Sequence, residues 1–253
     1  MRDAPPRPRA SATSAVRSPH VRPAPDEPDF SVGIALLGWF AALVISNIGA
    51  VVILAATDYS GVDYDSLPLW LIAVLQIPLW LGLVGAVVVV SKRFGTGSLR
   101  KDYGFSFRTG DVLGLPIGIV VQLVFVPLLY RALSVVVDTS AVDEPAKNLT
   151  DRAQGIGVAV LVVLVVVGAP IIEELFFRGL LLRSIQARWN DTLALLASSI
   201  LFGLAHFELL QLPALVLFGL VAGYCAQRTG RLGMSIWAHV GFNATTVVFL
   251  LAR

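Results

Sequence analysis

The chain has 253 residues, of which 56% are hydrophobic and only 14% are charged. Soluble domains carry about 25% charged residues, so this chain lacks the polar side chains to cover a water-exposed globule, and a soluble enzyme is excluded. Its single cysteine, Cys225, excludes a disulfide framework and a cysteine-based zinc site. The bilayer is the expected solvent. No nucleic-acid partner is expected, because the basic residues lie between apolar runs, where membrane topology accounts for them.

The first 29 residues differ in composition from the rest of the chain. They contain seven of the fourteen prolines and five arginines, with almost no bulky apolar side chain. Such a segment cannot bury a core. We therefore predict a disordered tail over 1–29 and a transmembrane helical domain over 30–253.

Seven apolar segments follow the tail. Each is expected to be a helix, because a backbone exposed to lipid must satisfy its own hydrogen bonds. The fifth and sixth are near 15 residues, shorter than the roughly 20 that a full span needs, so six to eight spans are expected. The segments are 33–56, 67–91, 112–137, 156–182, 193–208, 213–227 and 232–251.

The basic residues predict the orientation of these helices. Fifteen of the 19 lysines and arginines fall in the tail and in the loops on one side of the predicted bundle, against three on the other side. Basic loops stay in the cytoplasm, so the N-terminus is predicted to be cytoplasmic. The sequence thus predicts an all-α polytopic bundle of about seven spans in a cell membrane, surrounded by lipid.

Ionisable groups inside the later segments are few and concentrated. Each costs roughly 2.5–3.5 kcal/mol at the bilayer centre on insertion scales, so a group of them needs an explanation. Taken singly, each is typical of a buried ion pair or a core histidine. Together they indicate one polar site. They form three short patterns: Glu173-Glu174-x-x-x-Arg178, Phe202-x-x-x-His206 and His239-x-x-x-Asn243.

Helix geometry predicts that these patterns meet. Glu174 and His206 lie 16 residues on either side of Asn190, so in an antiparallel hairpin both are about 24 Å from the turn. Glu174 and Arg178 are spaced to pair at i,i+4, while Glu173 is rotated by about 100° and stays free for other contacts.

Hydrolysis is the chemistry that this residue set favours. A carboxylate and a histidine can activate water, and an amide with a second histidine can stabilise an oxyanion. Glu173, His206 and His239 could instead hold Zn²⁺, and the sequence does not separate the two mechanisms. The sequence has no His-Glu-x-x-His motif, no aspartate within a predicted span and no Gly-x-Ser-Gly element. These absences argue against a zincin-type helix, a two-aspartate site and a rhomboid-like serine dyad, respectively.

The three patterns, in this order on apolar segments, resemble the CPBP (Abi) family of intramembrane endopeptidases over about residues 110–253. This family includes type II CAAX prenyl endopeptidases and lysostaphin-resistance-like proteins. The resemblance implies a helical bundle with a cytoplasm-facing cavity and, as the favoured mechanism, hydrolysis without a metal. The roles it implies are water activation by Glu173 and His206, an oxyanion site of His239 and Asn243, and orientation of the first acid by Glu174 and Arg178.

The expected substrate is a membrane-anchored peptide or protein. Composition rich in Ala, Val and Arg suggests a bacterial inner-membrane protein, so a prenylated substrate is not expected. The alternative function is a non-proteolytic immunity or scaffold protein of the same family. A proton-coupled transporter is less favoured, because the charges lie in one half of the chain and no internal repeat is seen.

Overall fold

The structure is a computed structural model that describes residues 30–252. The predicted tail over 1–29 lies outside the described residues. Within them every regular element is a helix, which confirms the all-α class. The elements are α1 (Val32–Ala55), η1 (Tyr64–Ser66), α2 (Leu69–Phe94), α3 (Leu99–Tyr103), η2 (Thr109–Leu113), α4 (Gly114–Val120), η3 (Val121–Phe125), α5 (Val126–Leu133), α6 (Glu144–Asp151), α7 (Ile156–Leu161), η4 (Val162–Gly168), α8 (Ala169–Glu174), η5 (Leu175–Leu181), α9 (Leu182–Gln186), α10 (Asp191–Leu204), α11 (Leu212–Thr229) and α12 (Gly233–Leu251).

All seven predicted apolar segments form helices. In the described chain, six continuous helical stretches are long and apolar enough to cross a membrane: 32–55, 69–94, 109–133, 156–186, 212–229 and 233–251. The predicted fifth segment is the shorter helix α10, with 14 residues. The protein is therefore a multi-pass membrane protein, and its span count agrees with the prediction of about seven.

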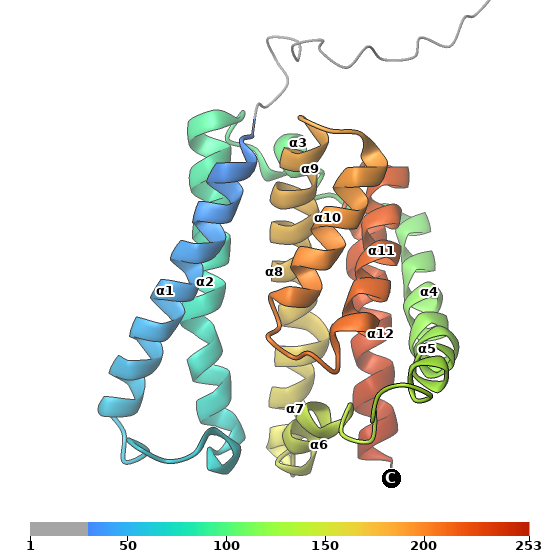
Figure 1. The fold of residues 1–253 in the computed structure, drawn as a ribbon. Coiled ribbons are helices and arrows are strands. Elements are labelled where there is room, and N and C mark those ends of the chain that lie inside the picture. The colour runs from blue at the N-terminus through green and yellow to red at the C-terminus, as the bar shows by residue number, and fades with distance from the viewer. Residues whose placement is uncertain (1–29, 253) are drawn as a thin grey trace, which may run out of the picture.

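The helices run up and down in a bundle, with the α1–α2 hairpin on one side and α4 and α5 beside α12 (Figure 1). The α2–α4 loop, the α9–α10 turn and the α11–α12 turn meet at one end, where Arg183 Nη2 donates to the Gly230 carbonyl at 2.9 Å and Leu232 N donates to the Gly104 carbonyl at 2.9 Å. We call this the basic end, and the opposite end, which carries α6 and the end of α12, the α6 end. The basic end holds Lys92, Arg93, Arg100, Lys101, Arg108, Arg183, Arg188, Arg228 and Arg231.

Helix α12 packs against α4 at close range. A Cβ atom on Gly118 would lie 1.9 Å from the Ala238 carbonyl oxygen, and one on Gly114 would lie 2.1 Å from the Met234 carbonyl oxygen. Small residues four apart let two membrane helices approach this closely. The contact sets the position of α12, which carries His239 and Asn243.

The stretch over 156–186 is not a uniform α-helix. Two π-helical segments, η4 and η5, flank the short helix α8. Pro170 near the start of α8 has no N–H to donate. The π-helical segment η4, whose hydrogen bonds span one residue more than those of an α-helix, ends directly before α8. π-Turns of this kind are frequent at functional sites. Glu173 and Glu174 are the last two residues of α8 and lie between the two π-helical segments.

Candidate active site

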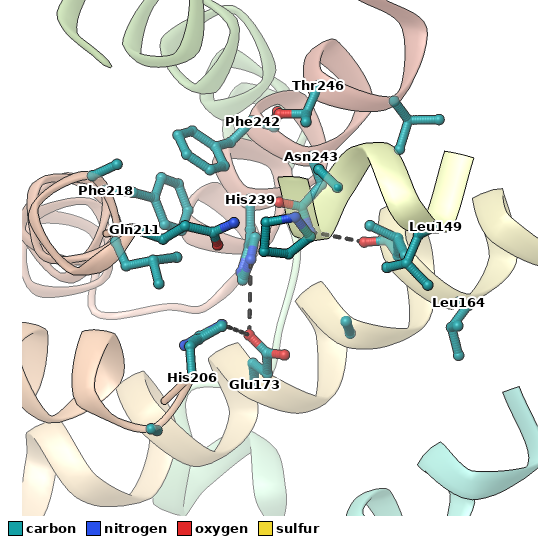
Figure 2. Close-up of a pocket in the computed structure, with 18 of the residues that line it drawn as sticks. Leu149, Leu164, Glu173, His206, Gln211, Phe218, His239, Phe242, Asn243 and Thr246 are labelled. Carbon is teal, nitrogen blue, oxygen red and sulfur yellow. Dashed lines mark hydrogen bonds and ion pairs between the residues drawn. The ribbon is translucent and has the colours of Figure 1, made fainter. Parts of the chain in front are cut away.

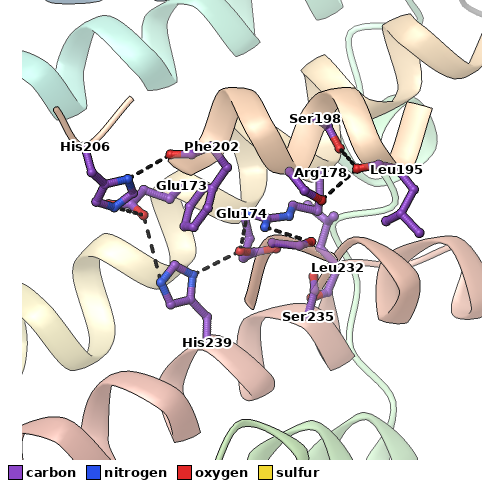
Figure 3. Close-up of polar contacts among 12 residues, drawn as sticks. Glu173, Glu174, Arg178, Leu195, Ser198, Phe202, His206, Leu232, Ser235 and His239 are labelled. Carbon is purple, nitrogen blue, oxygen red and sulfur yellow. Dashed lines mark hydrogen bonds and ion pairs between the residues drawn. The ribbon is translucent and has the colours of Figure 1, made fainter. Parts of the chain in front are cut away.

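The structure brings the six predicted site residues into one region of the bundle. Figure 3 shows all of them except Asn243, which Figure 2 shows with Glu173, His206 and His239. Three elements supply them: the α8–η5 stretch, the turn that follows α10, and helix α12. The segments that carry the three patterns therefore meet in the structure, as predicted. The residues are Glu173, Glu174, Arg178, His206, His239 and Asn243.

Glu173 lies between the two histidines. Its Oε2 atom is 3.9 Å from His206 Nε2 and 3.9 Å from His239 Nε2. These distances are longer than a direct hydrogen bond and are ones that a single water can bridge. The Glu173 side chain is 18% exposed and lines a cavity, while two imidazoles face its carboxylate.

Each histidine is oriented by a hydrogen bond at its other ring nitrogen. His206 Nδ1 lies 2.8 Å from the Phe202 carbonyl oxygen, and because a carbonyl only accepts, Nδ1 carries the proton. His239 Nδ1 lies 3.0 Å from Glu174 Oε1 and donates to that carboxylate. Both rings therefore turn Nε2 toward Glu173 (Figure 3).

The Glu174–Arg178 pair forms as predicted, with Arg178 Nη1 donating to Glu174 Oε1 at 2.8 Å. Both side chains are buried, and Arg178 also donates to the Gly219 carbonyl at 3.2 Å. Its guanidinium lies 4.3 Å from the ring centroid of Phe202. Glu174 also contacts His239, whose Nε2 atom lies 3.9 Å from Glu173 Oε2. The orientation of Glu173 by Glu174 and Arg178 stays a prediction.

Asn243 joins the site from α12, four residues after His239. Its Nδ2 donates to the Val165 carbonyl at 2.8 Å, which ties α12 to the π-helical segment η4. The amide has two N–H donors, so one is left to face the cavity that Asn243 lines with Glu173 (Figure 2).

A cavity of about 460 Å³ adjoins the site. Its lining begins at Glu173, His206 and His239 and continues to Leu149 and Asp143 on and next to α6, while none of its described lining residues comes from the basic end. Packed aromatic rings and the buried Glu174–Arg178 pair fill the bundle toward the basic end. The cytoplasm-facing orientation of the cavity stays a prediction.

Two cavity-lining residues outside the three patterns have polar atoms in need of a partner. Trp80 Nε1 and Gln122 Oε1 are buried, and neither has a hydrogen-bond partner among the described residues. Neither residue belongs to the three predicted patterns, in which Asn243 is the one neutral polar side chain. A glutamine in the middle of an apolar segment was the available signal for Gln122.

The predicted zinc ligands do not fit the ion as they are placed. Bonds of about 2.0–2.1 Å in a tetrahedral site set ligand atoms about 3.3 Å apart, whereas the histidine Nε2 atoms are 3.9 Å from Glu173 Oε2. In the part of the chain that the structure describes, no group of three or more His, Cys, Asp or Glu side chains is arranged to hold a metal.

With this geometry established, the chain can be compared with known families. Residues 155–245 match the model of the Rce1-like family of type II CAAX prenyl endopeptidases. The match confirms the resemblance predicted from the three patterns. All six predicted site residues lie within the Rce1-like segment.

Curated relatives and solved structures add to the comparison. The protein named "Putative membrane peptidase YdiL" of Bacillus subtilis (strain 168) is 29% identical over 108 residues, or 43% of each chain. An uncharacterized 24.3 kDa protein of Escherichia coli is 37% identical over 87 residues, which are 32% of this chain and 39% of that one. The matched region thus spans about two fifths of the length of each relative. No solved structure matches.

Proposed function

We propose that this protein is an intramembrane endopeptidase that hydrolyses peptide bonds of membrane-anchored proteins or peptides, in a bacterial inner membrane. The Rce1-like segment and the membrane peptidase relative support a membrane protease at the family level. The observation that carries the proposal further is the placement of Glu173 Oε2 at 3.9 Å from Nε2 of both His206 and His239, beside a cavity.

The proposed reaction starts from a water held between Glu173 and His206. As the water oxygen attacks the peptide carbonyl carbon, its proton passes to Glu173. The free N–H of Asn243 and His239, with both ring nitrogens protonated, donate hydrogen bonds to the oxyanion. Glu173 then returns the proton to the leaving amine as the C–N bond breaks. Glu174 and Arg178 hold His239 in place for this step.

The test of the base is a pair of chemically identical substitutions. Glu173→Gln keeps the shape of the side chain but cannot take a proton, so cleavage of tagged membrane peptides should fall by about 10²–10⁴-fold. Glu208→Gln makes the same change on an exposed side chain between α10 and α11 and should leave cleavage unchanged. Wild-type activity in Glu173→Gln would refute the assignment. A scaffold protein would show no cleavage in any form while Glu173→Gln still supports the cellular phenotype.

The mechanism without a metal is tested on the purified wild-type enzyme. Because a carboxylate activates the water in the proposed mechanism, prolonged treatment with a chelator should leave the cleavage rate unchanged. A loss of activity that added zinc restores would contradict it and favour a metal held by Glu173, His206 and His239.

A further inference from the structure

Two buried polar atoms in the walls of the cavity lack a partner among the residues that the structure describes. They are Gln122 Oε1 and Trp80 Nε1. Both side chains line the same cavity as Glu173, His206 and His239. Buried polar atoms are nearly always hydrogen-bonded, so two such atoms beside a candidate active site indicate that the cavity takes up a polar ligand.

The packing of α4 on α12 places Gln122 level with Asn243. A Cβ atom on Gly118 would lie 1.9 Å from the Ala238 carbonyl oxygen and 2.7 Å from Phe242 N. The two helices run parallel (Figure 1), and the π-helical segment η3, which contains Gln122, continues the contact with α12. One turn beyond Gly118, Gln122 therefore lies opposite the next turn of α12, which carries Asn243.

Trp80 lies at a similar level in another wall. A Cβ atom on Gly168 would lie 2.4 Å from Trp80 Cη2, so the indole packs against η4. Val165 of the same segment accepts the hydrogen bond from Asn243, and Gly168 follows it within one turn. Helix α2, which carries Trp80, packs against α7, α8 and η5, whereas Gln122 belongs to the segment that packs on α12. The two atoms thus lie in different walls, both near the level of Asn243.

The two atoms complement a peptide backbone. Gln122 Oε1 accepts a hydrogen bond and Trp80 Nε1 donates one, and a peptide carries one N–H and one C=O at each residue. In an extended segment these groups point alternately to opposite sides, so one segment can meet both walls. A helical segment pairs the same groups internally and has none to offer. The pair of atoms therefore fits an extended peptide.

The spacing along α12 relates this contact to the bond that is cut. Asn243 follows His239 by four residues, which is about 6 Å along the helix axis. An extended chain advances about 3.3 Å per residue. A substrate N–H that meets Gln122 therefore lies about two residues from a scissile carbonyl held between Glu173 and His239.

We propose that Gln122 and Trp80 bind the substrate backbone and hold the segment next to the scissile bond extended. Gln122 accepts from a substrate N–H, and Trp80 donates to a substrate C=O. This inference rests on the proposed peptidase function and names its substrate class: a segment that is unwound at the cleavage site and bound through its backbone. Because neither contact involves a substrate side chain, binding here tolerates many sequences.

Binding to an inactive protein tests the proposal separately from catalysis. The parent is the full chain carrying Glu173→Gln in lipid nanodiscs, and the probe is a fluorescent, palmitoylated alanine–leucine peptide, measured against empty nanodiscs. Gln122→Leu and Trp80→Phe each remove one hydrogen-bonding atom and should weaken binding about tenfold. Gln154→Leu changes an exposed glutamine outside the cavity lining and should bind the peptide like the parent.

Thermal unfolding separates a binding role of Gln122 from a structural one. A glutamine that supports the fold loses stability when it is replaced. Leucine in place of an unpaired buried polar atom should instead leave the melting temperature unchanged or raise it. A fall in the melting temperature of Gln122→Leu would assign the side chain to the fold and overturn the proposal.

Ester substitutions in the peptide identify the hydrogen bond itself. Each backbone N–H of the peptide is replaced in turn by an ester oxygen, which cannot donate. One ester peptide should bind the parent about tenfold more weakly than the amide peptide, yet bind Gln122→Leu as tightly as the amide peptide does. Equal losses in both proteins at every position, unchanged binding by Gln122→Leu, or no binding to the parent would each overturn the proposal. Because the parent is inactive by design, these outcomes are distinct from a failure of Glu173→Gln to lose cleavage.

Discussion

At the scale of single residues, the turn after α10 has an unusual backbone. Phe207 is the one non-glycine residue in the described chain with a positive φ, at +57°. It directly follows His206, and its ring stacks on Trp39, with centroids 6.4 Å apart and an interplanar angle of 11°. The left-handed conformation costs an L-residue about 1–2 kcal/mol. Phe207 therefore carries this conformational cost directly after His206, where its backbone sets the direction in which the chain leaves the site.

This strain predicts that glycine at position 207 is more stabilising than alanine, the reverse of their usual order. Phe207→Gly and Phe207→Ala both lose the ring contact with Trp39, but only glycine relieves the positive φ. The glycine variant should therefore be more stable than the alanine variant by about 1 kcal/mol, measured by thermal unfolding in detergent. Equal stability of the two variants, or the opposite order, would show that the turn is relaxed.

The buried pair behind His239 makes a second prediction at this scale. Arg178→Met leaves the Glu174 carboxylate buried without its cation, which should cost about 3–5 kcal/mol of stability. Adding Glu174→Gln removes the orphaned charge, so the double variant should be less destabilised than the sum of the two single variants. Unfolding in mixed micelles measures the cycle, and strict additivity would mean that the two side chains do not interact.

At the scale of helices, the approach of α4 to α12 positions half of the site. Gly118→Ala would place a methyl group 1.9 Å from the Ala238 carbonyl oxygen, so α12 must move away, carrying His239 and Asn243. Overpacking of this kind costs about 1–3 kcal/mol, and peptide cleavage should fall together with the melting temperature. Gly85→Ala in α2, where a Cβ atom meets nothing within 4 Å, is the matched control and should preserve both. Normal cleavage by Gly118→Ala would show that the contact is not needed for the site.

At the scale of the whole molecule, the bundle presents an apolar outer surface. Leu81, at the centre of α2, is 66% exposed and faces the expected lipid. Leu81→Lys should cost roughly 2.5–3.5 kcal/mol of insertion free energy and reduce the fraction of protein in the membrane. Leu113→Lys changes a side chain of similar exposure near the basic end, where the amine reaches water, and should insert normally. Equal insertion of the two variants would place the membrane elsewhere on the bundle.

Composition and residue spacing alone predict the helices, the Glu174–Arg178 pair and the meeting of two segments of the site. Apolar length predicts the helices because lipid leaves the backbone no other hydrogen-bond partners. The i,i+4 spacing predicts the Glu174–Arg178 pair because helix geometry is local. Equal distances from Asn190 predict the meeting of the two segments because an antiparallel hairpin preserves depth. These properties depend on covalent order and helix pitch alone.

The tertiary structure decided what depends on packing between segments far apart in the chain. It places His239 against Glu174, because the side chain of α12 that meets the buried acid depends on how α12 packs against α8. It also leads the cavity toward α6, because rings contributed by several helices fill the other side. A sequence names the charges and their order along the chain. The space left between packed side chains is a property of the assembled bundle.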